Sequence, residues 1–230
     1  MINFAIRYRP IVQELCRRRP PLVLDVGSGP EGLAMFWRGT VIGIDLGFKR
    51  PPLHHAVRAS SLALPFAEAS CAVVVGCDML EHLPADLRRS AVLEMARVAS
   101  PLLMLSFPSG EPATQVYRKL AQQLAPAIPV WLQEHIANGL PDAHQVATWL
   151  LEAGWSVSTI WYESATTHAR LMNWESRRPA ALLTYSVMRL CGRWLGPRIP
   201  VPAQEPYLRV LVKAERNPTA AGAGFRSAFE

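Results

Sequence analysis

Glycines and one carboxylate near the N-terminus form the first pattern with a clear chemical use. Gly27-x-Gly29-x-x-Gly32 follows the apolar run Leu22–Val26, and Asp45 ends a second apolar run about 20 residues on. Glycines at this spacing let the backbone approach a ligand, and a carboxylate after the next strand can bind ribose hydroxyls. The pattern predicts a site for a ligand that contains adenosine. Nicotinamide dinucleotides and S-adenosylmethionine both fit it.

The residue just before the glycine turn separates these two ligands. Asp25 lies two residues ahead of Gly27, so its carboxylate should face the mouth of the turn. A pyrophosphate there would be a like charge, whereas the amino group of a methionine moiety would be attracted. We also expect a helix to begin at 33–37, whose first turn would receive the methionine carboxylate. The pattern favours S-adenosylmethionine, with capping of that helix as the alternative role for Asp25.

Two histidines are candidates for proton transfer. Transfer of a methyl group to oxygen requires loss of the acceptor's proton, and imidazole titrates near neutral pH. His82 follows the fourth apolar run and is the leading candidate base, unless it only packs or hydrogen-bonds locally. His135, beside Glu134, lies in a segment that can cap the crevice, where it can act in catalysis, in acceptor binding or as a structural contact.

Acidic residues near these histidines raise the question of a metal ion. No pair shows a diagnostic ligand spacing such as HExxH, so we predict no metal ligands. The residues that could gather are Asp78, Glu81, His82, Glu111, Glu134 and His135.

The elements that position these residues are apolar runs alternating with helical patterns. Strands are expected at 22–26, 41–45, 55–58, 72–77, 102–107, 155–161 and 207–214, and helices at 11–18, 85–99, 115–124, 130–137 and 145–153. Pro10 should occupy the first turn of the first helix, and Arg88 and Arg89 should be exposed. Such alternation indicates β-α-β units in a doubly wound α/β fold. The carboxyl ends of its strands should converge on one crevice.

The chain outside this core divides into three segments. We expect a single domain over 1–214, with a helical cap insertion at 111–141 and a variable segment at 166–202. Within the latter, 179–198 is predicted to be an amphipathic helix that packs on the core, pairs in a homodimer, covers the acceptor or lies on a membrane. Residues 215–230 should form a flexible tail.

Read in order, four segments resemble class I S-adenosylmethionine-dependent methyltransferases of the small bacterial type. The matches are Asp-Val-Gly-Ser-Gly at 25–29, the run ending in the ribose-binding acid at 41–45, Leu-Pro-Phe beside the adenine at 64–66, and Asp-Met-Leu-Glu-His-Leu-Pro over the methionine end at 78–84. The resemblance covers about residues 15–110, and more loosely 142–161 and 206–214. It implies a Rossmann-like, seven-stranded, mostly parallel sheet with an antiparallel last strand.

The resemblance also implies site residues. It assigns S-adenosylmethionine contacts to Asp25, Gly27, Ser28, Gly29, Asp45, Leu46, Ser60, Ser61, Leu62 and Asp78. The chain departs from the family at three places: Ser60 replaces an acid that contacts adenine, Cys71–Ala72 replaces Phe-Asp, and Glu31 stands where a third close glycine is common. The first departure puts side-chain recognition of adenine in doubt.

The expected activity is methyl transfer to oxygen of a saccharide or another hydroxylated small molecule. The Glu-His-x-x-Gly-Leu-Pro segment at 134–141 is similar to methyltransferases associated with cell-envelope polysaccharide assembly, and no Asn-Pro-Pro-Tyr-like motif follows the fourth strand. The alternatives are a nicotinamide-dependent oxidoreductase and a methyltransferase-like binding subunit without catalysis.

Composition limits the partners and the compartment. Of 230 residues, 50% are hydrophobic and 18% charged, which excludes a wholly disordered chain. No apolar run is long enough to span a bilayer, and the first 20 residues contain five arginines, unlike a signal peptide. Four cysteines without CxxC spacing suggest reduced thiols in the cytoplasm. The net charge of +6 comes from scattered arginines, which disfavours nucleic acid and leaves peripheral membrane contact and a homodimer open.

Overall fold

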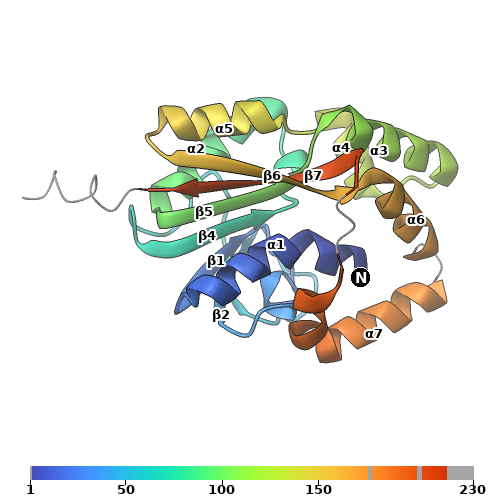
Figure 1. Cartoon of the computed structure of the whole chain (residues 1–230), viewed down its shortest axis with the longest axis horizontal. Helices are drawn as coiled ribbons and strands as arrows, with labels where there is room; N and C mark the ends of the chain where they lie inside the picture. The colour runs from blue at the N-terminus through green and yellow to red at the C-terminus, as the bar shows by residue number, and fades with distance from the viewer. Residues whose placement is uncertain (1, 176–177, 201–203, 217–230) are drawn as a thin grey trace, which may run out of the picture.

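The computed structural model describes residues 2–175, 178–200 and 204–216. Its strands are β1 (Leu22–Val26), β2 (Thr40–Asp45), β3 (His55–Arg58), β4 (Cys71–Cys77), β5 (Ala99–Pro108), β6 (Ser156–Ser164) and β7 (Tyr207–Glu215). These described strands form one seven-stranded sheet in the order β3-β2-β1-β4-β5-β7-β6 (Figure 1). The first five pair in parallel, and β7 lies antiparallel between β5 and β6. The Rossmann-like, mostly parallel sheet with an antiparallel last strand is confirmed.

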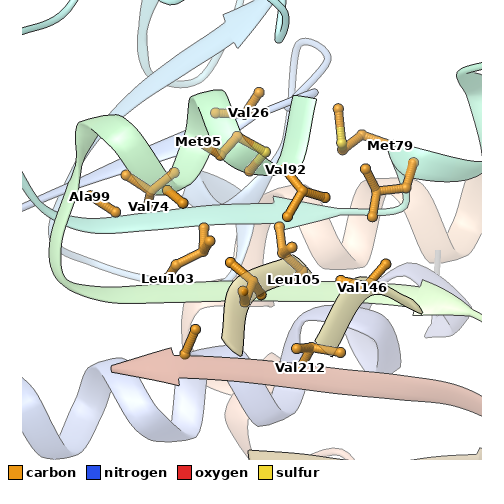
Figure 2. Close-up of a cluster of buried hydrophobic side chains, with 14 of the residues drawn as sticks. Val26, Val74, Met79, Val92, Met95, Ala99, Leu103, Leu105, Val146 and Val212 are labelled. Atoms are coloured by element: carbon orange, nitrogen blue, oxygen red, sulfur yellow. The ribbon is translucent and has the colours of Figure 1, made fainter. Parts of the chain in front are cut away.

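The central strands are apolar because helices cover both faces of the sheet. On one face lie α2 (Arg88–Val98) and α5 (Ala143–Glu152). Figure 2 shows Met95 of α2 and Val146 of α5 among strand residues such as Val26, Leu103 and Val212, all at most 1% exposed. This packing holds β1 and β4 side by side. The order of strands reverses between them, which is where open α/β sheets bind ligands.

The other face differs from two sequence predictions. Helix α1 spans Ile2–Arg18 with Pro10 in its interior, so the prediction that Pro10 occupies a first turn was wrong. Side chains on both sides of Pro10, including Tyr8 and Ile11, are fully buried against the sheet. Burial of this stripe outweighs the backbone hydrogen bond that proline cannot make. The predicted helix at 33–37 is also wrong, because only the 3₁₀ turn η1 (Leu33–Met35) forms there.

Helix α7 (Arg178–Leu195) and the 3₁₀ turn η4 (Gly196–Arg198) cover the place of that missing helix (Figure 1). Gly192 packs so closely that an added Cβ would lie 2.7 Å from the Met35 carbonyl oxygen. Arg193 Nε donates a hydrogen bond of 2.9 Å to the Ala34 carbonyl. The outer side of α7 leaves Leu182, Leu183, Leu190 and Trp194 exposed. Contact of this segment with a membrane or a second copy stays a prediction.

Four helical elements stand over the carboxyl end of the sheet (Figure 1): the turn η2 (Leu80–His82), α3 (Gly110–Leu124), α4 (Val130–Asn138) and α6 (Ala165–Glu175). A further turn, η3 (Ala85–Leu87), leads into α2. Helices α3 and α4 pack together through Tyr117, Leu120 and Leu132. Helices therefore follow the fifth strand, as the predicted cap at 111–141 requires.

The C-terminal boundary lies later than predicted. Glu215 is the last residue of β7, and Arg216 stacks on the ring of Trp155, so these two residues do not belong to a flexible tail. The rest of the predicted tail, 217–230, lies outside the described residues. Within the described residues, no helix combines the length and apolar character needed to cross a bilayer.

Candidate functional site

A cavity of about 610 Å³ opens at the carboxyl ends of β1, β2 and β4. Predicted site residues in its wall are Gly27, Ser28, Gly29, Asp45, Leu46, Ser61, Asp78, His82 and His135. Other wall residues include Arg7, Tyr8, Glu31, Ile44, Met79, Glu81, Trp131 and Met172. The fold therefore brings both halves of the predicted site, the glycine turn and the two histidines, to one cavity.

The glycine turn folds back onto the end of β2. The backbone amides of Gly27 and Ser28 both donate to the Ile44 carbonyl, at 2.8 and 3.1 Å. Gly27 has φ +76°, and an added Cβ would lie 2.6 Å from Met79 Cβ. This position requires glycine both for its backbone conformation and for the space it leaves.

Asp45 is fixed at the cavity wall by the same turn. Its Oδ2 accepts a hydrogen bond of 2.9 Å from the Gly29 amide. The neighbouring Leu46 is 70% exposed, so it offers an apolar surface at the cavity mouth. Asp45 thus holds an oriented carboxylate at the cavity wall, and its contact with ribose hydroxyls stays a prediction.

Three predicted cofactor residues lie outside the cavity wall. Asp25 is fully buried beneath the turn, where its Oδ2 accepts a bond of 2.7 Å from the Leu33 amide and one of 3.4 Å from the Tyr8 hydroxyl. Burial raises the pKa of Asp25 to about 7. Ser60 Oγ accepts from the Leu62 amide at 3.1 Å, and neither residue reaches the cavity. Asp25 therefore holds the first residue of η1 and does not line the cavity, whereas Ser61, between Ser60 and Leu62, does.

Asp78 belongs to a buried network of charges that the sequence patterns did not reveal. Arg7 Nη1 lies 2.6 Å from its Oδ2, and Arg209 pairs with its Oδ1. Arg209, fully buried, also lies 2.6 Å from Glu163, whose other oxygen is 2.8 Å from His168 Nδ1. The two arginines outweigh burial and hold the pKa of Asp78 below its usual value. These partners lie on helices and strands far apart in sequence, so no local motif signals them.

His82, the candidate base, is oriented by Glu134, which the sequence also predicted to belong to the site. His82 Nδ1 lies 2.6 Å from Glu134 Oε2, and His82 Nε2 is 3.5 Å from His135 Nε2. Glu134 itself is not part of the cavity wall. The His135 ring is flanked edge-on by those of Trp131 and Tyr117, at centroid distances of 5.3 and 5.0 Å. Turn η2 and helix α4 thus bring all three predicted catalytic residues together.

Glu81 is the residue of this cluster that the sequence patterns assigned no role. It is fully buried, and neither carboxylate oxygen has a hydrogen-bond partner among the described residues. Its Oε1 lies 4.0 Å from His135 Nε2. Burial, with Asp78 nearby, raises the pKa of Glu81 to about 8. Burial and the neighbouring His82 lower the pKa of His135 to about 3.

Arg88 joins the two elements that carry the cluster. It is only 5% exposed, so the prediction that Arg88 lies on the surface was wrong. Its guanidinium donates to the Leu80 and Leu83 carbonyls of the η2 region at 3.0 and 3.2 Å. It also donates to the Asn138 and Gly139 carbonyls at the end of α4, at 2.9 and 2.6 Å. Four carbonyl partners make Arg88 a positioning residue for His82 and His135.

Comparison with known proteins places the fold among solved methyltransferases. No protein-family model and no curated protein sequence matches the chain. Magnesium protoporphyrin IX methyltransferase from Synechocystis PCC 6803, solved with S-adenosylhomocysteine, superposes with a TM-score of 0.56 at 15% identity over 94% of this chain and 84% of that one.

Two further solved methyltransferases are similar in fold to this chain. A SAM-dependent methyltransferase from Archaeoglobus fulgidus has a TM-score of 0.51 at 14% identity, covering 90% of this chain and 93% of that one. Phospholethanolamine N-methyltransferase 2 from Haemonchus contortus, solved with phosphomonomethylethanolamine and S-adenosylhomocysteine, has a TM-score of 0.52 at 12% identity. That match covers 90% of this chain and 52% of the larger one. The chain therefore has the fold of S-adenosylmethionine-dependent methyltransferases.

Proposed function

We propose that this chain is an S-adenosylmethionine-dependent methyltransferase that methylates a hydroxyl group of a small acceptor, such as a saccharide. The observation that carries the proposal is the single cavity shared by the glycine turn, Asp45 and the histidine cluster. Methyl transfer from a sulfonium depends mainly on holding donor and acceptor in line. A cavity with a nucleoside site at one end and proton-accepting groups at the other meets that need.

The nucleoside end favours S-adenosylmethionine over a dinucleotide. A pyrophosphate binds where a glycine turn opens into an α-helix. Here the turn is followed only by the three residues of η1, so that helix start is missing. The methionine carboxylate, which we expected at this helix start, is assigned instead to the guanidinium of Arg7 in the cavity wall. Asp45 is assigned to the ribose.

The other end of the cavity must take up one proton. In the reaction, the acceptor oxygen bonds to the methyl carbon, the carbon–sulfur bond breaks, and its electron pair leaves with sulfur as a neutral thioether. The hydroxyl proton leaves to the cluster around His82. Glu134 orients this ring through Nδ1, which leaves Nε2 on the side of His135. Trp131 adds an apolar ring to the wall, a surface suited to the face of a sugar.

We infer the chemical class of the acceptor from the residues of this chain's own cavity. The porphyrin and phosphoethanolamine compounds named for two of the similar structures differ chemically, so they do not choose an acceptor for this chain. A link to cell-envelope polysaccharide assembly and a cytoplasmic location stay predictions from sequence.

Calorimetry and a turnover assay test the proposal together. We expect S-adenosylmethionine and S-adenosylhomocysteine to bind with one site per chain and NAD not to bind. Formation of S-adenosylhomocysteine should then appear with members of a panel of sugars, lipid-linked sugars and phenols. Binding of NAD alone would instead indicate the oxidoreductase. Cofactor binding without turnover across the panel would indicate a binding subunit.

A further inference from the structure

Three side chains that can ligate a metal ion converge at the acceptor end of the cavity. One atom each from Glu81, His82 and His135 lies within 4.8 Å of the others. Both oxygens of the fully buried Glu81 lack a hydrogen-bond partner among the described residues, and so does His135 Nδ1. Buried carboxyl groups, whether charged or neutral, are normally hydrogen-bonded, because leaving water without a compensating partner costs free energy. The missing partner of Glu81 therefore points to a ligand at this position.

We infer that Glu81, His82 and His135 form a binding site for one divalent first-row transition-metal ion, of the Zn²⁺ or Mn²⁺ type. Two imidazoles and one carboxylate are the ligand set that leaves open positions on such ions. Mg²⁺ and Ca²⁺ prefer oxygen ligands alone, so the two imidazoles disfavour them. The site faces the cavity, which leaves the remaining positions of the ion for water or an acceptor oxygen.

The geometry requires only a small contraction of the cluster. Ligand atoms about 2.1 Å from an ion lie about 3 to 3.5 Å from one another. The two Nε2 atoms of His82 and His135 are already 3.5 Å apart, and His135 Nε2 is 4.0 Å from Glu81 Oε1. Rotation of these side chains can close the difference, and the ion would replace the long 3.5 Å contact between the two Nε2 atoms.

The surroundings of the site match those of ligating histidines. A metal-bound histidine usually gives its other ring nitrogen to a carboxylate, which fixes the ring orientation. Glu134 does this for His82, with a separation of 2.6 Å from Nδ1. The backbone on both sides is held by Arg88, and Asn138 Nδ2 donates a bond of 3.1 Å to the His82 carbonyl. The ligands from η2 and α4 are therefore positioned before any ion binds.

A cation here would change how the acceptor is activated, and this part rests on the proposed function. The acceptor hydroxyl would bind the ion, which lowers the pKa of a coordinated O–H group. The proton would leave to solvent, and the bound oxygen would attack the methyl carbon with the bond changes given above. His82 Nε2 would then be a metal ligand and no longer the free base.

Metal binding to the purified full chain tests the site independently of activity. After dialysis against a chelator, calorimetry with Zn²⁺, Mn²⁺, Mg²⁺ and Ca²⁺ should show one transition-metal site per chain and at least tenfold weaker binding of Mg²⁺ and Ca²⁺. Glu81→Gln and His135→Ala should each weaken binding by about 100-fold or more. The exposed His144→Ala and Glu68→Gln are matched controls and should bind as the unaltered chain does. Thermal unfolding confirms that each variant is folded.

The possible outcomes distinguish failure of the metal site from failure of the proposed methyltransferase function. Failure of Zn²⁺ and Mn²⁺ to bind, or equal binding by folded Glu81→Gln and His135→Ala variants, overturns the metal site. Specific metal binding without S-adenosylmethionine binding retains the site and overturns the proposed function. Full turnover in the chelated protein retains the proposed function and overturns the role of the ion in activating the acceptor.

Discussion

The two ends of the cavity are built in different ways. At the nucleoside end, the turn is held by backbone bonds from Gly27 and Ser28 to Ile44 and by the bond from Gly29 to Asp45, a separation of 16 positions. At the acceptor end, His82 pairs with Glu134 across 52 positions of sequence, and Arg209 reaches Asp78 across 131. The nucleoside of a cofactor is always the same group, so a turn and the end of one neighbouring strand can bind it. A site for proton transfer requires charged groups that different elements bring together.

The two ends also differ in their electrostatics. The nucleoside end places two acidic side chains, Asp45 and Glu31, in its wall, and a third acid, Asp25, is fully buried beneath the turn. The acceptor end contains Asp78, Glu81, His82 and His135 in the wall, supported by buried arginines. Substitutions at the first end should therefore act on cofactor binding, whereas those at the second should act on chemistry or on folding.

The largest expected effect is on turnover at the acceptor end. His82→Ala should lower kcat by about 10²–10⁴-fold, whether His82 takes the proton itself or holds the cation. The dissociation constant of S-adenosylmethionine, measured by calorimetry, should change little. His144→Ala, an exposed histidine on α5, provides the control and should keep full activity. Equal kcat values for His82→Ala and the unaltered chain would remove His82 from the chemistry.

The charge network behind Asp78 should control folding. Arg209→Met leaves the carboxylates of Asp78 and Glu163 without their shared buried partner. Breaking a buried ion pair from one side costs about 3–5 kcal/mol, so the free energy of unfolding should fall by about that much. Urea denaturation measures it, with the exposed Arg118→Met as a control that should lose little. A loss under 1 kcal/mol would show that the network does not support the fold.

A smaller effect is expected at the nucleoside end, on binding alone. Asp45→Ala removes the oriented carboxylate and should raise the dissociation constant of S-adenosylmethionine by about 10–100-fold, the equivalent of one or two charged hydrogen bonds. Binding of Zn²⁺ or Mn²⁺ to the chelator-treated Asp45→Ala variant should be unaffected, because Glu81, His82 and His135 are unchanged. Unaltered cofactor affinity in Asp45→Ala would mean that the two ends have been assigned wrongly.

The most gradual effect, spread over several pH units, concerns the pH dependence of stability at the nucleoside end. The pKa of Asp25 is raised to about 7 by burial, against about 3.9 in an unfolded chain. The folded state therefore binds more protons between pH 4 and 7. The contribution of Asp25 to stability should fall as pH rises through this window, by at most about 1.4 kcal/mol per pH unit, and level off above pH 7.

Comparison of variants isolates this contribution from that of other buried acids. Asp25→Asn keeps an oxygen for the Leu33 amide and should flatten the slope between pH 5 and 7. The exposed Asp86→Asn should leave the slope unchanged. Parallel slopes for the unaltered chain and Asp25→Asn would show that Asp25 is ionised throughout.

The sequence by itself determined the features that depend on residues close together in the chain. Short apolar runs and turn glycines located the strands, and the motifs placed Gly27, Asp45 and His82 at one edge of the sheet, because parallel strands end together. These features depend on neighbouring residues, whose spacing fixes which way the backbone and side chains point.

Only the tertiary structure decided the rest. Pro10 lies inside α1 because burial of the surrounding stripe outweighs local preference, and α7 from the far end of the chain covers the place of a helix expected after the glycine turn. The roles of Arg88 and Glu81 likewise follow from partners on other elements. A buried charge is stabilised by whatever the fold brings beside it, and that partner leaves no mark in the adjacent sequence.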